Sequence, residues 1–323
     1  MSTSSAYSGA FDRLVAGIVP YVPQPIVRRL AQPYVAGTTL DDAVRTVREL
    51  NAAGLQATVD VLGEAVRDAA TASAAADSCI RALDVISAEA LGATISVKPS
   101  AVGSELSWDI ACGQIERVVR RAEELGSFVC IDMEDSGSTD HTLALFRRLR
   151  EAGHTQVGTV LQARLWRTAA DAAALAPLRP TIRLCKGIYQ ESPAVAMHDR
   201  DAIRRSFSRI LRLLLGAGAF VSVATHDEEL IVDALDAIDK TGVAPDGYEF
   251  QTLLGVRPDL ARVLARDHTV RLYVPFGPDS YAYSQRRLRE NPQIAGYVAR
   301  DVLRAFARSV RRPPTQPPYG GTQ

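Results

Sequence analysis

The sequence predicts an α/β fold, a (βα)8 barrel of the TIM type with a helical extension at its N-terminus. Two observations support this. From residue 55 onward, eight short runs of β-branched and aromatic residues recur, and most of them precede a stretch rich in Ala, Leu and Arg with helical periodicity. Apolar strands that alternate with amphipathic helices form a parallel sheet covered on its outside, and eight such units close a barrel.

The alternative fold is an open, doubly wound sheet. We favour it less because the first strand lacks a glycine-rich GxGxxG turn and the chain shows no obvious division into halves. The eight predicted strands lie within residues 55–62, 93–100, 127–134, 156–163, 181–187, 219–225, 246–252 and 270–277.

Helices are predicted from their start and stop signals. The first begins after Thr39, a plausible N-cap, and stops at Gly54. Others follow the strands, within residues 80–92, 112–126, 142–153 and 227–242. Several end in a glycine just before the next strand, as expected for a left-handed helix terminus, at Gly92, Gly126 and Gly153.

Three regions are expected along the chain. Residues 1–40 contain two proline-flanked, helix-like stretches, which we expect to pack on the barrel or cap it. Residues 41–310 form the barrel, and the proline-rich residues 311–323 form a disordered tail.

Composition points to a cytoplasmic protein with a small ligand. The formal net charge of the 323 residues is zero, so nothing favours nucleic acid as a partner. The four cysteines have no CxxC spacing, which suggests a reducing compartment and no zinc site. We expect neither secretion nor a membrane span, because no signal peptide and no run of 18 apolar residues is present.

Polar side chains end almost every predicted strand. In a barrel of this kind apolar layers fill the interior, while catalytic groups gather at the C-terminal ends of the strands. The residues at these ends are Lys98, Ser100, Asp132, Glu134, Gln162, Arg183, Lys186, Thr225, His226, Asp227, Gln251 and Tyr273. We expect Glu134 and Asp135 to begin a solvated loop.

Lysine is rare in this chain, which has three lysines and 34 arginines. Two of the three, Lys98 and Lys186, stand at strand ends, where a compact point charge would be specifically required. The alternative is an ordinary snorkelling or ion-paired side chain. Asp132 can pair with Lys98 on the adjacent strand. Alternation places Arg183 and Cys185 on one face of their strand, so Lys186 points elsewhere or lies past the strand end.

A helix is predicted to begin near Asp279, directly after the eighth strand. Spacings of three or four residues let Tyr283, Arg286 or Arg287, and Glu290 share one side of it. An arginine pair there could fork a carboxylate over the barrel mouth. The alternative is a solvated face with an Arg286–Glu290 ion pair.

Common hydrolytic motifs are absent from the sequence, which has no HExxH, no GxSxG and no P-loop. Two classes of enzyme fit the polar residues that remain. One binds a cofactor with anionic and hydrogen-bonding edges and a small carboxylate substrate; the other is a Schiff-base aldolase that uses Lys186 or Lys98.

An ordered set of strand-end motifs resembles the proline dehydrogenase family, in its monofunctional bacterial form. The motifs are SVKPS, CIDMED, VLQA, RLCKGIYQE, VATHD, YEFQTLLG and YVPFG with SQRRLREN, within roughly residues 30 to 295. The resemblance implies a distorted (βα)8 barrel that binds FAD. It also implies oxidation of L-proline to 1-pyrroline-5-carboxylate by hydride transfer to the flavin, the first step of proline catabolism to glutamate.

The resemblance also implies roles for individual residues. Asp132 and Arg183 match positions treated as catalytic. Substrate-binding positions match Lys98, Leu253, Tyr273, Tyr283, Arg286 and Arg287. Flavin contacts match Met133, Gln162, Arg183, Lys186, Gly187, Ile188, Thr225, His226 and Glu290, with Gln162 on the isoalloxazine and Lys186 on the pyrophosphate.

Three positions depart from the family pattern. Cys185 stands where valine is usual, Ile188 where alanine is frequent, and Pro99 where leucine is common. Ile188 could narrow the pocket, so hydroxyproline is an alternative substrate.

Partners follow from the same resemblance. We expect L-proline as substrate, a membrane quinone or other electron acceptor, and a separate pyrroline-5-carboxylate dehydrogenase that consumes the product. The amphipathic residues 11–31 are a candidate for peripheral contact with the inner membrane face, and packing against the barrel is the alternative.

Overall fold

The computed structural model describes residues 32–63, 66–278 and 280. All of them lie in one compact unit, Ala31–Ser284. The predicted N-terminal helices fall outside the described residues, apart from a short 3-10 turn at Gln32–Tyr34. The predicted C-terminal tail also lies outside them.

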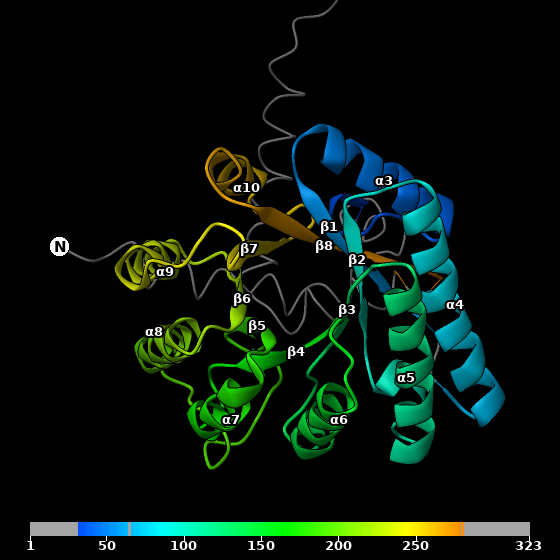
Figure 1. Cartoon of the computed structure of the whole chain (residues 1–323), viewed down its shortest axis with the longest axis horizontal. Coiled ribbons are helices and arrows are strands. Elements are labelled where there is room, and N and C mark those ends of the chain that lie inside the picture. Colours follow the sequence, from blue (N-terminus) through cyan, green and yellow to red (C-terminus); the bar gives the residue numbers. More distant parts are fainter. Residues whose placement is uncertain (1–31, 64–65, 279, 281–323) are drawn as a thin grey trace, which may run out of the picture. The chain divides into compact units, whose positions relative to one another are not determined.

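Eight parallel strands close a barrel, as predicted (Figure 1). Each strand pairs with the next along the chain, and the last pairs with the first. The strands are β1 (Gln56–Val61), β2 (Ala93–Val97), β3 (Val129–Ile131), β4 (Val157–Gln162), β5 (Thr181–Cys185), β6 (Phe220–Ala224), β7 (Tyr248–Leu253) and β8 (Val270–Phe276).

Helices surround the strands on the outside (Figure 1). Within the described residues these are α3 (Leu40–Ala52), α4 (Ala69–Ala88), α5 (Trp108–Glu124), α6 (Thr139–Glu151), α7 (Thr168–Leu175), α8 (Arg200–Gly216), α9 (Glu228–Thr241) and α10 (Pro258–Leu264). No helix among these residues combines the length and apolar character that crossing a bilayer requires.

The first predicted helix is confirmed, with its cap. Thr39 is the N-cap of α3, and a capping box links its side chain and backbone to Asp42. Hydrogen bonds from Arg45 and Thr39 lower the pKa of Asp42 to about 2. The start of α4 was predicted too late: the helix begins at Ala69, because Asp68 caps it by accepting a hydrogen bond from the Thr71 amide.

Two of the three predicted left-handed glycines are confirmed. Gly126 has φ +63° and Gly153 has φ +94°. The prediction for Gly92 is wrong: Ala90, with φ +49°, takes the left-handed conformation after α4. The amide of Gly92 instead donates to Asn51 Oδ1 (2.8 Å), which ties the start of β2 to the end of α3.

The expectation of an apolar barrel interior is wrong. Because side chains alternate along each strand and register partners share a face, the contacts of Asp132 and Arg183 identify the inner face of the wall. The polar residues on that face include Gln56, Thr58, Asp60, Ser96, Arg183, Ser222, Glu249, Gln251, Arg271 and Tyr273. The outer face carries the apolar core, including Ala57, Val59, Ile95, Val97, Val129, Ile131, Ile182, Leu184, Val221, Val223 and Phe250. The helices bury this outer face, and the interior remains available for hydrogen-bonded polar groups.

Candidate active site

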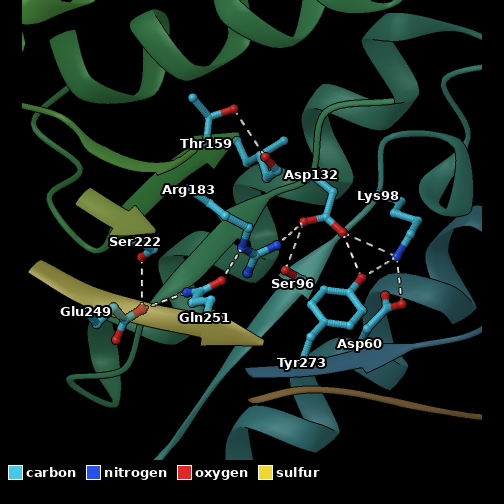
Figure 2. Close-up of polar contacts among 11 residues, drawn as sticks. Asp60, Ser96, Lys98, Asp132, Thr159, Arg183, Ser222, Glu249, Gln251 and Tyr273 are labelled. Carbon is cyan, nitrogen blue, oxygen red and sulfur yellow. Dashed lines mark hydrogen bonds and ion pairs between the residues drawn. The ribbon is translucent and has the colours of Figure 1, made fainter. Parts of the chain in front are cut away.

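Asp132, directly after β3, is the centre of a buried polar cluster at the C-terminal ends of the strands (Figure 2). Its Oδ1 accepts hydrogen bonds from Ser96 Oγ (3.0 Å) and from a terminal guanidinium nitrogen of Arg183 (2.6 Å). Its Oδ2 accepts from the Tyr273 hydroxyl (2.9 Å) and lies 3.3 Å from Lys98 Nζ. Four elements of the barrel therefore meet at one carboxylate, and the predicted pairing of Asp132 with Lys98 is present.

The carboxyl group of Asp132 is held in its ionised form. Burial acts to raise its pKa, but the charges of Lys98 and Arg183 and the hydrogen bonds from Tyr273 and Ser96 outweigh it, so the pKa lies below its ordinary value. Both oxygens are engaged by donors. Asp132 is therefore suited to orienting its neighbours and poorly suited to accepting a proton.

Lys98 lies between two carboxylates. Its Nζ is 2.6 Å from Asp60 Oδ2 on β1 and donates to the Tyr273 hydroxyl at 2.7 Å. That hydroxyl in turn donates a hydrogen bond to Asp132. Asp60 was missed by the sequence analysis. The signal was the strict alternation in QATVDV, which puts Gln56, Thr58 and Asp60 on one face of the strand. The structure places Asp60 in register with Ser96 on β2.

Arg183 is fixed from two sides in the barrel interior. Nε donates to Gln251 Oε1 (2.6 Å), while the guanidinium also contacts Asp132 and lies 5.3 Å from the centre of the Tyr273 ring. Burial acts to lower the pKa of Arg183, but the groups around it, Cys130 and Asp132 first among them, leave it above its ordinary value. Arg183 is thus a permanent cation with a fixed orientation.

Lys186 belongs to a second charged group, away from Arg183, as the alternation along β5 predicts. Its amine pairs with Asp227, which also accepts two hydrogen bonds from Arg204 (2.9 Å each). Burial acts to raise the pKa of Asp227, yet Arg204 and Lys186 lower it to about 2. Burial lowers the pKa of Lys186, and Asp227 only partly offsets this.

Gln162 lies close to Gly187, the residue next to Lys186 in the chain. The Gln162 amide donates to the Glu134 carbonyl (2.6 Å), while its buried Oε1 has no hydrogen-bond partner within the described part of the chain. Gly187 has φ +96°, and a Cβ there would lie 2.7 Å from this same oxygen. Position 187 therefore requires glycine, because of its positive φ and because any side chain would collide with Gln162 and Arg164.

His226 follows β6 and is neutral at physiological pH. Its Nε2 accepts the backbone N–H of Leu253 (3.0 Å), which places any ring proton on Nδ1. Burial is the main cause that lowers its pKa to about 4. The neighbouring Thr225 is buried and accepts the amide of Asp227 (3.1 Å), so it orders the turn into α9.

The prediction that Glu134 is solvated is wrong. Glu134 is half-buried and accepts two hydrogen bonds from Ser100, at 2.8 Å from the amide and 2.5 Å from the hydroxyl. Burial raises its pKa. The two donors of Ser100 compensate the carboxylate for its lost water, so Glu134 joins the loop after β2 to the loop after β3.

The remaining predicted site residues are distributed as follows. Met133 is buried, whereas Leu253 and Ile188 are half-buried, each at or just beyond the end of its strand. Four predicted residues lie outside the described part of the chain, namely Tyr283, Arg286, Arg287 and Glu290.

Comparison with known proteins identifies the family. The model of the proline dehydrogenase family matches residues 43–300. This chain belongs to the proline dehydrogenase family. The proline dehydrogenase of Deinococcus radiodurans is 38% identical over 280 residues, which cover 85% of this chain and 90% of that protein. Proline dehydrogenase 1 of Bacillus subtilis is 35% identical over 275 residues, covering 85% and 91%.

More distant relatives of the family are longer. The bifunctional protein PutA of Escherichia coli is 26% identical over 355 residues, which are 92% of this chain but 26% of that protein. Among solved structures, proline utilization A from Bdellovibrio bacteriovorus inactivated by N-propargylglycine matches with a TM-score of 0.76 and 20% identity, covering 88% of this chain and 37% of that one. This structural likeness supports the barrel fold.

Proposed function

We propose that this chain oxidises L-proline to 1-pyrroline-5-carboxylate, the first step of proline catabolism, with FAD as the electron acceptor. The observation that carries the proposal is the buried cluster of Lys98, Asp132, Arg183 and Tyr273 at the barrel mouth, in a chain whose relatives at 35–38% identity are named proline dehydrogenases. It is a polar site with fixed charges of both signs, as binding a small zwitterion requires.

The described residues fit a flavin nucleotide. Gln162 Oε1, which has no hydrogen-bond partner among the described residues, can accept from a ring N–H, and the adjacent Gly187 has no side chain that would cover this oxygen. Lys186 supplies a cation for a pyrophosphate. When bound, the flavin supplies the acceptor for the hydride of the proline ring.

We propose that Lys98 does not hold the substrate carboxylate alone. Two protein carboxylates already lie within 3.3 Å of its amine, so much of its charge is balanced. A substrate carboxylate therefore needs further cations, which supports the expected role of Arg286 and Arg287. Leu253, Tyr273 and Tyr283 would wall the ring of the substrate.

Arg183 and Asp132 have different proposed roles. Arg183, a permanent buried cation, would stabilise negative charge that develops on the flavin side of the site. Asp132 would hold Lys98, Arg183 and Tyr273 in place. The substrate amine must be neutral when the hydride leaves, and we propose that the Lys98–Asp132 pair disfavours the ammonium form.

An Asp132→Ala variant tests this assignment. We expect turnover to fall by about 100-fold or more and the pH profile of kcat/KM to shift, because Lys98 and Arg183 lose their common partner. Ser96→Ala is the matched control: it removes one hydrogen bond to Asp132 and keeps the carboxylate with its ion pairs to Lys98 and Arg183, so the pH profile should shift much less than in Asp132→Ala. Unchanged turnover and pH profile in Asp132→Ala would contradict the role given to the pair.

The direct test of the reaction is spectroscopic. Protein purified with FAD should show a flavin absorbance band that bleaches when L-proline is added anaerobically. Hydroxyproline, the alternative substrate, should be compared at the same concentrations because Ile188 could change the preference. Protein that binds no flavin, and whose Lys98 or Lys186 is trapped on a carbonyl substrate by borohydride, would favour the aldolase instead.

We also propose partners and a location for the enzyme. The family resemblance supports three of these. A membrane quinone reoxidises the reduced flavin, the enzyme contacts the inner membrane face from the cytoplasm, and a separate pyrroline-5-carboxylate dehydrogenase consumes the product. The much longer bifunctional relative is consistent with a second enzyme that acts next. Quinone reduction in the presence of proline and cosedimentation with anionic vesicles test the first two of these proposals.

A further inference from the structure

A line of hydrogen-bonded polar side chains extends from the candidate active site into the barrel interior (Figure 2). Gln251 accepts from Arg183 Nε (2.6 Å) and donates to Glu249 Oε1 (2.6 Å). The same carboxylate accepts from Ser222 Oγ (2.8 Å) and from Arg271 Nε (2.9 Å to Oε2). Glu249 is 3% exposed and Gln251 7%, so no bulk water competes for these bonds.

We propose that Glu249 is a positioning residue, which acts through the amide of Gln251 to set the orientation of Arg183. This inference rests on the proposed function for the role of Arg183, but the geometric part stands without it. Glu249 is two hydrogen bonds away from Arg183 and three away from Asp132, so it acts on the candidate substrate site only through other side chains.

The argument depends on what each group can donate or accept. A carboxylate only accepts hydrogen bonds, and a guanidinium only donates them. Gln251, between the two, must turn its NH2 toward Glu249 and its oxygen toward Arg183. The flipped amide would place oxygen against carboxylate and NH2 against guanidinium, which are two repulsive contacts. The charge of Glu249 therefore selects one orientation of Gln251.

The orientation of Gln251 in turn limits the movement of Arg183. The guanidinium donates through Nε to Gln251 and through a terminal nitrogen to Asp132. Two acceptors at different edges of one planar group define both its position and its plane. Loss of the Gln251 oxygen would leave Arg183 held by Asp132 alone and free to rotate about that contact.

Glu249 is itself anchored at the far end of the line. Arg271 contacts both of its oxygens and also donates to the Ala57 carbonyl (2.8 Å) and to Gln56. Ser222, the register partner of Arg183, adds a further donor. Strands β1, β6, β7 and β8 thus locate the carboxylate before it acts on Gln251.

The test compares Glu249→Gln with variants that separate positioning from general damage. In Glu249→Gln the amide can donate to Gln251, so Gln251 can flip and Arg183 loses its acceptor. We expect kcat to fall about tenfold or more, with KM within about twofold, because a small misplacement near the reacting atoms is costly. The crystal structure of this variant should show Arg183 displaced from Gln251 Oε1.

The swap Glu249→Gln with Gln251→Glu returns an acceptor to Arg183 and should restore most of kcat. Like Glu249→Gln alone, this double variant leaves Arg271 without its carboxylate partner. It therefore controls for the stability lost with the Glu249–Arg271 ion pair. In an Arg183→Met background, adding Glu249→Gln should reduce kcat no further. If Glu249→Gln does not fold, Gln251→Met removes the same bond to Arg183 and keeps the Glu249–Arg271 pair.

Three results would overturn the proposal. The first is an Arg183 side chain that has not moved in the Glu249→Gln crystal structure, and the second is an unchanged kcat in folded Glu249→Gln. The third is a further fall in kcat when Glu249→Gln is added to Arg183→Met. If the wild-type protein does not oxidise proline, the proposed function fails, and the position of Arg183 in the crystal structures still decides whether Glu249 sets it.

Discussion

The outer face of the barrel wall carries Val, Ile, Leu and Phe against the helices, whereas the inner face carries carboxylates, guanidinium groups, amides and hydroxyls. Leu184 and Arg183 are neighbours on β5 and show the difference. Leu184 is fully buried in the apolar core, and Arg183 makes two hydrogen bonds at 2.6 Å inside the barrel. One face supplies stability by removing apolar surface from water, and the other keeps polar groups in fixed positions.

Because the two faces differ in this way, substitutions on them should affect stability and turnover differently. A change on the outer face should lower the free energy of unfolding and leave turnover alone. A change on the inner face should lower turnover more than its effect on folding explains. Two predictions test this separation, and two more extend the comparison to loop residues at the barrel mouth, from the largest expected effect to the smallest.

Replacement of Arg183, on the inner face, should have the largest effect on stability and turnover. In Arg183→Met, Asp132 loses one partner, so we expect a loss of about 3–5 kcal/mol in unfolding free energy and of about 10²–10³ in kcat. Arg121→Met is the control, because Arg121 pairs with Asp84 and Glu124 on the exposed helix surface. There we expect at most about 1 kcal/mol and unchanged kcat. Equal losses of unfolding free energy and kcat in both variants would contradict the distinction between the barrel interior and the helix surface.

Truncation on the outer face should affect folding only. Leu184→Ala leaves a cavity between β5 and the helices, so we expect the unfolding free energy to fall by about 2–5 kcal/mol. The kcat of the folded protein should stay within about twofold. Leu184→Met, which nearly conserves volume, should cost less than about 1.5 kcal/mol. Denaturant unfolding and steady-state kinetics measure both; a hundredfold loss of kcat in Leu184→Ala would contradict the separation.

Acid should lower the free energy of unfolding, because His226 at the barrel mouth becomes protonated. Its pKa falls from 6.5 to about 4 on folding, so the unfolded chain binds more protons between these values. The contribution of neutral His226 to the free energy of unfolding is therefore fully present above about pH 6.5. It is lost as the pH falls toward 4, by about 3 kcal/mol at most. Asp227, with a pKa of about 2, adds its own loss only below about pH 4.

The control for this pH dependence is His226→Asn, whose side-chain oxygen can still accept the Leu253 amide. Its unfolding free energy should change much less between pH 6.5 and 4. Identical slopes for the wild type and the variant would show that another group is responsible.

Glycine at the mouth should matter for cofactor binding as well as for folding. Gly187→Ala and Gly218→Ala both place a side chain at positive φ, +96° and +73°, at a cost of about 1–2 kcal/mol each. Only the Cβ at 187 meets neighbours, 2.7 Å from Gln162 Oε1 and 2.8 Å from Arg164 Cδ. FAD titration should therefore show weaker binding for Gly187→Ala and unchanged binding for Gly218→Ala. Equal FAD affinities would remove Gly187 from the cofactor site.

The eight strands could be predicted from the sequence because each is a short β-branched run bounded by a turn or a helix. The search for polar residues at strand ends found Lys98 and Asp132, which directly follow β2 and β3. It also found Arg183 and Tyr273, although these lie in the middle of β5 and β8 and not at their ends, and the structure brings all four together. The rule works for Lys98 and Asp132 because all parallel strands end at the same mouth, whereas Arg183 and Tyr273 reach Asp132 from the inner face of the wall.

The interior could not be predicted in the same way. Asp60 and Glu249 lie within strands, and the residues next to them in the sequence give no sign of which group each carboxylate meets. Their partners Lys98 and Arg271 are distant in sequence and meet them only after the barrel closes. The left-handed turn at Ala90 also escaped, because residue type alone favours the nearby Gly92.

The alternation of the wall has a consequence for how this chain can change in length. A single residue inserted into or deleted from β5 would turn Arg183 toward the helices and Leu184 toward the candidate active site. The same shift in any other strand would exchange its two faces at once. Substitutions within one face can accumulate one by one, but changes of length within the strands cannot. We therefore expect length differences among homologous chains to fall in the loops between strands and helices, and the strands to keep their residue count.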